Sequence, residues 1–112
     1  MDAELMEVEK ISDHAILILP KTLEDVRPWM EEIIQLKSEG YRNFILNLSD
    51  KDWLASKEIA TIMWTFKDLS ASGQRLSLIV DSPTLLKTFQ TTMLDKMVSI
   101  VESKDEALAE LE

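Results

Sequence analysis

The sequence predicts an α/β fold, a single domain over residues 1–112 with a mostly parallel mixed sheet of about four to five strands and about four helices. Short apolar runs alternate along the chain with longer segments of helical periodicity. Strands that are separated by crossover helices run parallel, whereas the first two apolar runs are joined by a short turn and form an antiparallel hairpin. A chain of 112 residues has room for one hydrophobic core.

The chain begins with this hairpin. Residues Glu4–Glu9 alternate between apolar and charged side chains, which is typical of an edge strand with one solvated face. A turn at Ser12–His14 leads to Ala15–Leu19, an apolar run that indicates a more buried strand. Pro20 ends this strand because proline has no N–H group to donate to a sheet.

A helix is predicted between this hairpin and Gly40. Thr22, followed by Asp25 three residues later, forms a weakened capping box at its start. Pro28 falls just past the first turn, so the helix either kinks there or begins near Arg27. Its inward stripe is predicted to contain Val26, Met30, Ile33, Ile34 and Lys37.

The middle of the chain predicts a central strand and a second helix. Residues Phe44–Leu48 are apolar apart from Asn47, the pattern of a strand that is covered on both faces. A polar loop follows, and a helix is predicted from Ser56 to Gly73, with Gly73 as its C-cap. The side chains predicted to point inward are Ile59, Ile62, Met63, Phe66 and Leu69.

The last third of the chain repeats the pattern. A buried strand at Leu76–Val80 is followed by Asp81–Pro83, a cap residue with proline at the first helical position, and the helix runs to about Met93. A short strand is predicted at Met97–Val101. The capping box at Ser103–Glu106 then opens a terminal helix with Leu108 and Leu111 on one side.

Composition excludes several classes of function. The chain has no cysteine, which removes disulfides, thiolate catalysis and sulfur-ligated metals. Its only two glycines, Gly40 and Gly73, are too far apart to form a phosphate-binding glycine loop, and its net charge of −9 repels nucleic acid and anionic lipid. No apolar run is long enough to insert into a membrane, and the N-terminal residues predict no secretion signal, so a cytoplasmic location fits.

His14, the only histidine, is the candidate for acid–base chemistry. It lies in the predicted hairpin turn with no nucleophile near it in sequence, which favours a solvated turn residue. A metal site built on one imidazole would need scattered carboxylates to complete it. We therefore expect no catalytic residues, no metal and no cofactor, and the protein is predicted not to be an enzyme.

The segment from Asn43 to Ser56 is the most informative for function. A buried strand runs into a polar turn, and a helix begins at Ser56. A serine in this position is either a structural N-cap, worth about 1 kcal/mol, or a hydroxyl that a kinase phosphorylates. A phosphate there would be stabilised by the helix dipole, by roughly 0.3–2 kcal/mol.

The motifs at Ile45–Asp50, Leu54–Ser56 and Leu76–Pro83 together resemble a STAS domain, the fold of bacterial anti-sigma factor antagonists and of the C-terminal domains of sulfate transporters. Residues Leu94–Met97 and Ser103–Leu108 extend the resemblance to nearly the whole chain. It implies a non-catalytic module that binds a protein partner, such as a kinase-like anti-sigma factor that phosphorylates a serine.

The motif that carries this serine is degenerate here. Antagonists have D-S-S-G or D-S-x-G at the start of the second helix, and the matching residues are Ala55, Ser56, Lys57 and Glu58. Ser56 is thus the candidate phosphorylation site, but Glu58 would repel a phosphate. At a separation of ~6 Å each pair of unit charges costs about 0.7 kcal/mol in water and up to ~3 at a protein surface. Met93 stands where the family often has glycine.

Partner binding is predicted around this helix. Trp53 lies in the loop before Ser56, and Trp64 lies on the flank of the helix. Trp64 either covers part of the neighbouring helix or anchors a partner, because tryptophan is enriched at interface hot spots. The partner-binding residues are predicted to be Trp53, Lys57, Glu58, Thr61, Trp64 and Asp68.

The sequence is compatible with two functions. The first is an anti-sigma factor antagonist-like module that binds a kinase-like anti-sigma factor or another regulatory partner. The second is a STAS-like subunit of a larger assembly, such as a lipid-transport complex or a signalling scaffold, without phosphorylation. Ala55 and Glu58 favour the second.

Overall fold

The computed structural model of the protein describes residues 5–111. The predictions made for Met1–Glu4, namely the missing secretion signal and the first residue of the edge strand, lie outside the described residues, as does Glu112. The elements are, in order, β1 (Met6–Lys10), β2 (Ala15–Pro20), α1 (Val26–Ser38), β3 (Asn43–Asn47), α2 (Ser56–Ala71), β4 (Arg75–Ile79), α3 (Pro83–Thr91), the 3-10 helix η2 (Leu94–Lys96), β5 (Ser99–Val101) and α4 (Lys104–Ala109).

The predicted fold class and strand directions are confirmed. The five strands form one sheet in the order β1-β2-β3-β4-β5. β1 pairs with β2 antiparallel, and every other neighbouring pair is parallel. The parallel pairs follow from the helices that connect them, since a crossover returns the chain to the same end of the sheet. The carboxyl ends of β2, β3, β4 and β5 therefore share one edge of the sheet.

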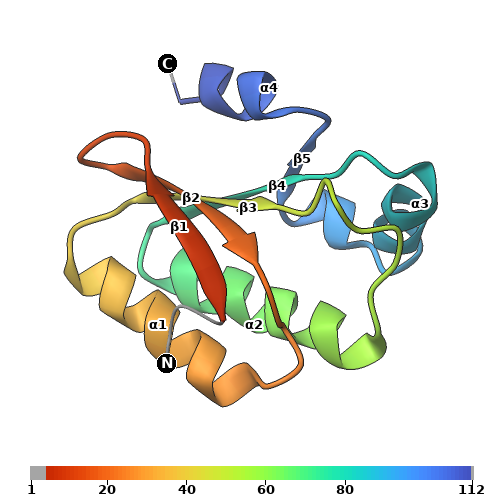
Figure 1. Ribbon diagram of the computed structural model, residues 1–112, viewed down its shortest axis with the longest axis horizontal. Helices are drawn as coiled ribbons and strands as arrows, with labels where there is room; N and C mark the ends of the chain where they lie inside the picture. Colours follow the sequence, from red (N-terminus) through yellow and green to blue (C-terminus); the bar gives the residue numbers. More distant parts are fainter. Residues whose placement is uncertain (1–4, 112) are drawn as a thin grey trace.

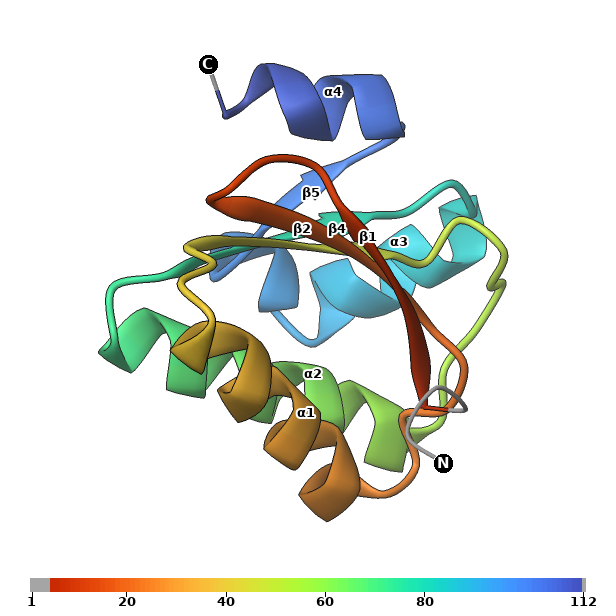
Figure 2. The same cartoon turned by 60° about the vertical axis from the view of Figure 1, so that its left-hand side comes forward.

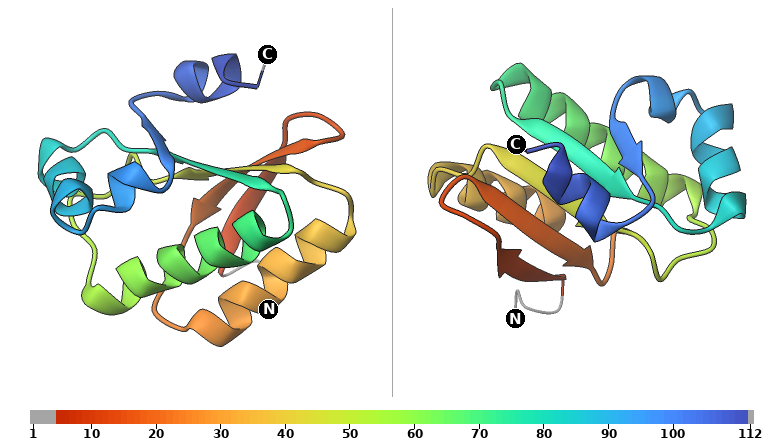
Figure 3. Two further views of the ribbon diagram at one scale, coloured as in Figure 1. Left: turned by 180° about the vertical axis from the view of Figure 1, so that it is seen from behind. Right: turned by 90° about the horizontal axis from the view of Figure 1, so that it is seen from above.

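The sheet lies between two unequal helical layers. In Figures 1 and 2, α1, α2 and α3 lie below the sheet, and α4 alone lies above it. Figure 3 shows α4 crossing over the strands when the molecule is viewed from above. The lower layer packs on alternate strand residues such as Ile18, Phe44 and Leu78, whereas α4 covers Leu17, Ile45 and Ile79. The alternation of side chains along each strand separates these two apolar clusters.

Helix α1 differs from the prediction in which face it buries. Val26 and Ile34 are exposed, and the buried residues are Trp29, Ile33 and Leu36. Trp29, which the predicted stripe left out, is fully buried because its large ring reaches between α2 and the sheet. The predicted stripe was thus rotated about the helix axis, and only Ile33 lies at its buried centre.

Several predicted boundaries also move. Asp25, not Thr22, is the N-cap of α1, and it makes no side-chain capping bond. Pro28 lies within the first turn, where no intrahelical partner for an N–H group is needed, and the helix begins at Val26, next to the predicted start near Arg27. β5 begins at Ser99, not at Met97, because the chain first turns through η2. Within residues 5–111, no helix is long and apolar enough to cross a membrane.

Candidate functional site

The candidate site lies at the carboxyl edge of the sheet, where the loop after β3 leads into α2. In Figure 1 this is the yellow-green segment that descends from β3 to the lower helical layer. Leu48 is fully buried, and its N–H donates to the Ile79 carbonyl at 2.9 Å. Leu54, at the other end of the loop, is also buried. These two anchors fix the loop at both ends and leave its central residues at the surface.

Ser56 is exposed and occupies the first position of α2. The N-cap is Ala55, whose methyl group cannot accept a hydrogen bond, so the interpretation of Ser56 as a structural N-cap is wrong. No hydrogen bond of the Ser56 hydroxyl occurs among the described residues, and the backbone N–H groups of Ser56 and Lys57 likewise have no acceptor there. The hydroxyl is therefore accessible, next to two backbone donors at the positive end of the helix dipole.

Glu58 takes over part of the capping that Ala55 cannot provide. Its Oε1 accepts a hydrogen bond from the Ala55 backbone N–H at 2.7 Å, which is one half of a capping box. The other half is absent because an alanine side chain has no acceptor. The negative charge of Glu58 therefore lies at the N-terminus of α2, where it is stabilised by the helix dipole. This is the charge that a phosphate on Ser56 would meet.

Two tryptophans stand out from the surface on either side of Ser56 in sequence. Trp53, in the loop, is 68% exposed, and Trp64, two turns into α2, is 57% exposed. Lys67 Nζ lies 5.7 Å from the centroid of the Trp64 ring, a cation–π distance. An exposed indole is costly to leave in water, so both rings are candidates for burial against a partner.

The outward face of α2 is a stripe that runs from Ser56. At about 100° per residue, Ala60, Trp64 and Lys67 lie within about 80° of Ser56 around the helix axis. All of them are exposed, as is Lys57. Met63, half-buried, lies about 20° from Ser56 on the same stripe. Sequence reasoning missed Ala60, Met63 and Lys67, although they follow Ser56 at successive spacings of four, three and four residues, which is the spacing of one helix face.

Thr61 does not belong to this stripe, and its predicted place on the exposed surface is wrong. The side chain is 1% exposed, and its hydroxyl donates to the Leu23 carbonyl at 2.6 Å. The hydroxyl also lies 3.1 Å from the Lys57 carbonyl. Thr61 therefore joins α2 to the chain just before α1 and has no surface to offer to a partner.

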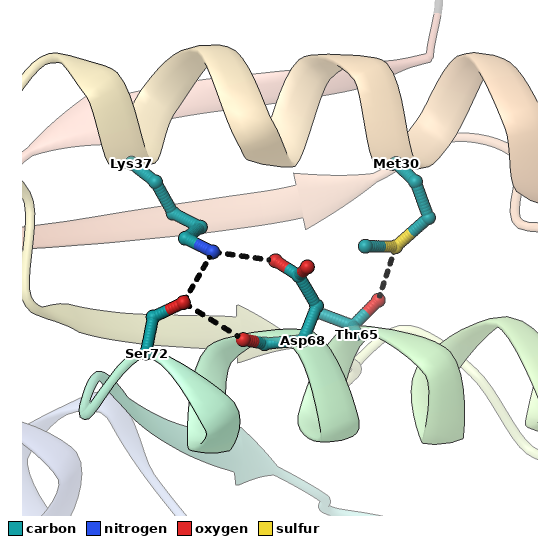
Figure 4. Close-up of polar contacts among 5 residues, drawn as sticks. All are labelled: Met30, Lys37, Thr65, Asp68 and Ser72. Carbon is teal, nitrogen blue, oxygen red and sulfur yellow. Dashed lines mark hydrogen bonds and ion pairs between the residues drawn. The ribbon is translucent and has the colours of Figure 1, made fainter.

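Asp68 is also engaged within the molecule. Figure 4 shows the contacts between α1 and α2, in which Lys37 Nζ lies 2.9 Å from Asp68 Oδ2 and 2.8 Å from the Ser72 hydroxyl. Deeper in the same seam, the buried Trp29 indole donates to the Thr65 hydroxyl at 2.8 Å. Because Lys37 and Asp68 are mostly covered, this ion pair holds the two helices together and leaves Asp68 at the margin of the outward stripe.

The remaining candidates for chemistry lie apart from α2. His14 is exposed in the turn between β1 and β2, where its backbone N–H donates to the Ser12 hydroxyl at 3.1 Å. Among residues 5–111, no group of three or more histidine, aspartate and glutamate side chains is placed to hold a metal ion. The exposed serine and the two tryptophans are therefore the distinctive features of this surface.

Known proteins resemble the chain over almost its full length, although no protein-family model matches it. A predicted anti-sigma factor antagonist from Thermotoga maritima is 24% identical over 106 residues, which cover 91% of this chain and 94% of the relative. A crystal structure of a predicted anti-sigma factor antagonist from the same organism has a TM-score of 0.77 at 21% identity, covering 97% of this chain and 96% of that one.

The Bacillus cell fate determinant SpoIIAA, solved in its phosphorylated form, has a TM-score of 0.69 at 18% identity, and the match covers 96% of this chain and 99% of SpoIIAA. These structures contain the same arrangement of a mixed sheet and flanking helices. The resemblance predicted from the sequence is confirmed: the chain is a STAS-like domain with the fold of the anti-sigma factor antagonists.

Proposed function

We propose that the protein is a non-catalytic regulatory module, like an anti-sigma factor antagonist, and that it binds a kinase-like anti-sigma factor or another regulatory protein through the start and outward face of α2. The observation that carries this proposal is the placement of Ser56. Its hydroxyl is exposed at the first position of α2, in line with Trp64 and next to the loop that bears Trp53. SpoIIAA, which has the same fold, exists in a phosphorylated form.

The roles of the individual residues follow from their chemistry. Trp53 and Trp64 supply the large apolar surfaces that anchor a protein interface. Lys57 and Lys67 give α2 a locally positive face on a chain of net charge −9, which favours a partner with acidic residues at its contact surface. A phosphate on Ser56 would reverse the charge at the start of this face and so weaken the same contact.

The proposal is tested with the ATP-binding anti-sigma kinase encoded closest to this gene. Incubation of the kinase with ATP and the protein is expected to place one phosphate on Ser56, located by mass spectrometry of peptides, with none on the Ser56→Ala variant. In a binding titration, Ser56→Ala should keep the wild-type affinity, whereas Ser56→Glu and Trp53→Ala should each weaken binding by about tenfold or more. Absence of both phosphorylation and binding would overturn the proposal.

Glu58 favours a second candidate function, a STAS-like subunit of a larger assembly, such as a lipid-transport complex or a signalling scaffold, without phosphorylation. Its carboxylate already caps α2 at 2.7 Å from the Ala55 nitrogen, so the helix start is neutralised without a phosphate. Under this alternative the partner binds Ser56→Ala and Ser56→Glu equally well, and Ser56 stays unmodified in the cell. Binding of the two variants to the same partner therefore separates the two functions.

A further inference from the structure

The outer surface of the α1/α2 layer carries two large apolar side chains, one on each helix and somewhat more than one helical turn apart along the helix axes. Ile34 is 52% exposed on α1, and Trp64 is 57% exposed on α2. Two contacts between the helices, seen in Figure 4, show which residues of α1 lie opposite which residues of α2. Met30 Sδ lies 3.7 Å from the Thr65 hydroxyl, and Lys37 Nζ pairs with Asp68. Ile34 lies between Met30 and Lys37 on α1, and Trp64 directly precedes Thr65 on α2.

A hollow lies beside the Trp64 ring. It has a volume of about 160 Å³ and is lined by Ala60, Met63, Trp64 and Lys67. This space suits one aliphatic side chain, and it is smaller than the roughly 300–1,000 Å³ of a typical small-molecule site. The shape therefore favours a side chain from a protein surface as its occupant.

The charges around the two features are complementary. Lys67 lines the hollow and is exposed, while Glu31 is exposed three residues before Ile34, a spacing that places their side chains as neighbours on α1. Within residues 5–111, neither Lys67 nor Glu31 takes part in an ion pair. The chain thus presents an apolar side chain with an acidic neighbour and a hollow with a basic rim, on adjacent helices of one face.

We propose that the protein forms a symmetric homodimer through the outer faces of α1 and α2. Ile34 of each copy occupies the hollow beside Trp64 of the other copy, and Glu31 pairs with Lys67 across the interface. A two-fold axis makes each of these contacts twice, which is the condition for a closed dimer. The dimer goes beyond the proposed function, because it requires neither phosphorylation of Ser56 nor a regulatory partner.

The dimer is tested by sedimentation velocity of the full chain from about 10 µM to about 1 mM, because the net charge of −9 on each copy limits the expected affinity. The mass is expected to rise with concentration from one chain to two. Trp64→Ala and Ile34→Ser should each remain monomeric throughout, with circular dichroism spectra like that of the wild type. Val8→Ser, which removes an equally exposed apolar side chain on β1, should dimerise as the wild type does.

A charge exchange tests the pairing itself. Glu31→Lys and Lys67→Glu should each weaken dimerisation by about fivefold to tenfold, because each lost pair is repeated by symmetry. The double variant should recover the wild-type dimer. A wild-type chain that stays monomeric up to about 1 mM, or a dimer that is unaffected by Trp64→Ala and Ile34→Ser, would overturn the proposal. Either result leaves the assays of Ser56 phosphorylation and partner binding unchanged.

Discussion

At the scale of single residues, the backbone of Met93 is the clearest departure from what the sequence usually permits. Met93 has φ +65° and is the one residue other than glycine with a positive φ in the described part of the chain. A side chain in this left-handed conformation costs roughly 1–2 kcal/mol, because Cβ crowds the backbone. The resemblance to STAS domains implies glycine at this position, and the dihedral angle gives the physical reason.

Met93→Gly is therefore expected to stabilise the protein, by about 1 kcal/mol in the free energy of unfolding, even though glycine gains entropy in the unfolded chain. The Met93 side chain is 54% exposed, so its removal sacrifices little buried surface. Urea denaturation followed by tryptophan fluorescence measures the change.

Met93→Ala is the matched control, since it removes the side chain beyond Cβ but keeps Cβ itself. It should not be stabilised. If alanine and glycine stabilised the protein equally, the side chain and not the backbone strain would be responsible.

At the scale of elements, the seam between α1 and α2 depends on a buried hydrogen bond. The Trp29 indole is fully buried and donates to the Thr65 hydroxyl, which itself donates to the Thr61 carbonyl at 2.8 Å. Thr65→Val keeps the shape of the side chain but leaves the indole N–H without a partner. We expect it to lower the free energy of unfolding by about 1–3 kcal/mol, whereas Thr65→Ser should lose less. Chemical denaturation of both variants checks this, and a Thr65→Val protein as stable as the wild type would contradict it.

The terminal helix α4 is attached to the sheet by apolar packing, by an ion pair between Lys104 and Glu9 of β1, and by the carboxylate of Glu110. Glu110 lies directly after α4 and accepts hydrogen bonds from the hydroxyls of Ser99 at 2.7 Å and Ser77 at 3.3 Å. Ala107, fully buried, and Leu108 pack on the apolar cluster beneath. Glu110→Ala leaves two partly buried hydroxyls without this acceptor and is expected to cost about 1–2 kcal/mol.

Hydrogen exchange measures this effect where it occurs. The amides of α4 and β5 should exchange faster in Glu110→Ala than in the wild type, while those of α1 should change little. Glu110→Gln, which keeps an acceptor oxygen, should behave more like the wild type. Uniform acceleration over the whole chain would mean that α4 is not a locally attached element.

Most elements could be predicted from the sequence because local signals agree with the tertiary structure. Ser82 and Pro83 begin α3 as predicted, with the Leu85 N–H donating to the Ser82 hydroxyl at 3.2 Å. The buried face of α1 could not be predicted, because apolar residues lie around much of that helix and tertiary packing selects Trp29 over Ile34. The start of α2 at Ser56 was predicted correctly, but the N-cap was not: Ala55 occupies that position, and a capping preference for serine does not reveal that Glu58 caps the helix from within.

The candidate site was predicted in position but not in detail. The sequence located Ser56, Trp53 and Trp64, since an exposed serine and tryptophans near a helix start are visible as residue types. It also assigned Thr61 and Asp68 to the surface, and this could not be corrected without knowing on which side α1 lies. Both residues face the seam with α1.

At the scale of the whole molecule, the two helical layers divide the surface into parts with different roles. α4 covers part of one face of the sheet, and α1 and α2 present an outer surface with exposed apolar side chains on the other. Trp64 belongs both to the proposed partner contact and to the proposed dimer. The two interactions would therefore compete, and binding of the regulatory partner should convert the dimer to a one-to-one complex.

Site-specific photo-crosslinking in the native host tests whether the outward face of α2 binds a regulatory protein. A photoreactive amino acid replaces Lys57 on α2 or, as a control, Asp105 on α4, both of which are exposed. A crosslink to one protein other than this chain is expected from position 57, to be lost when Trp64→Ala is added, and no crosslink is expected from position 105. A crosslink from position 105 alone, or one from position 57 that persists with Trp64→Ala, would contradict such binding.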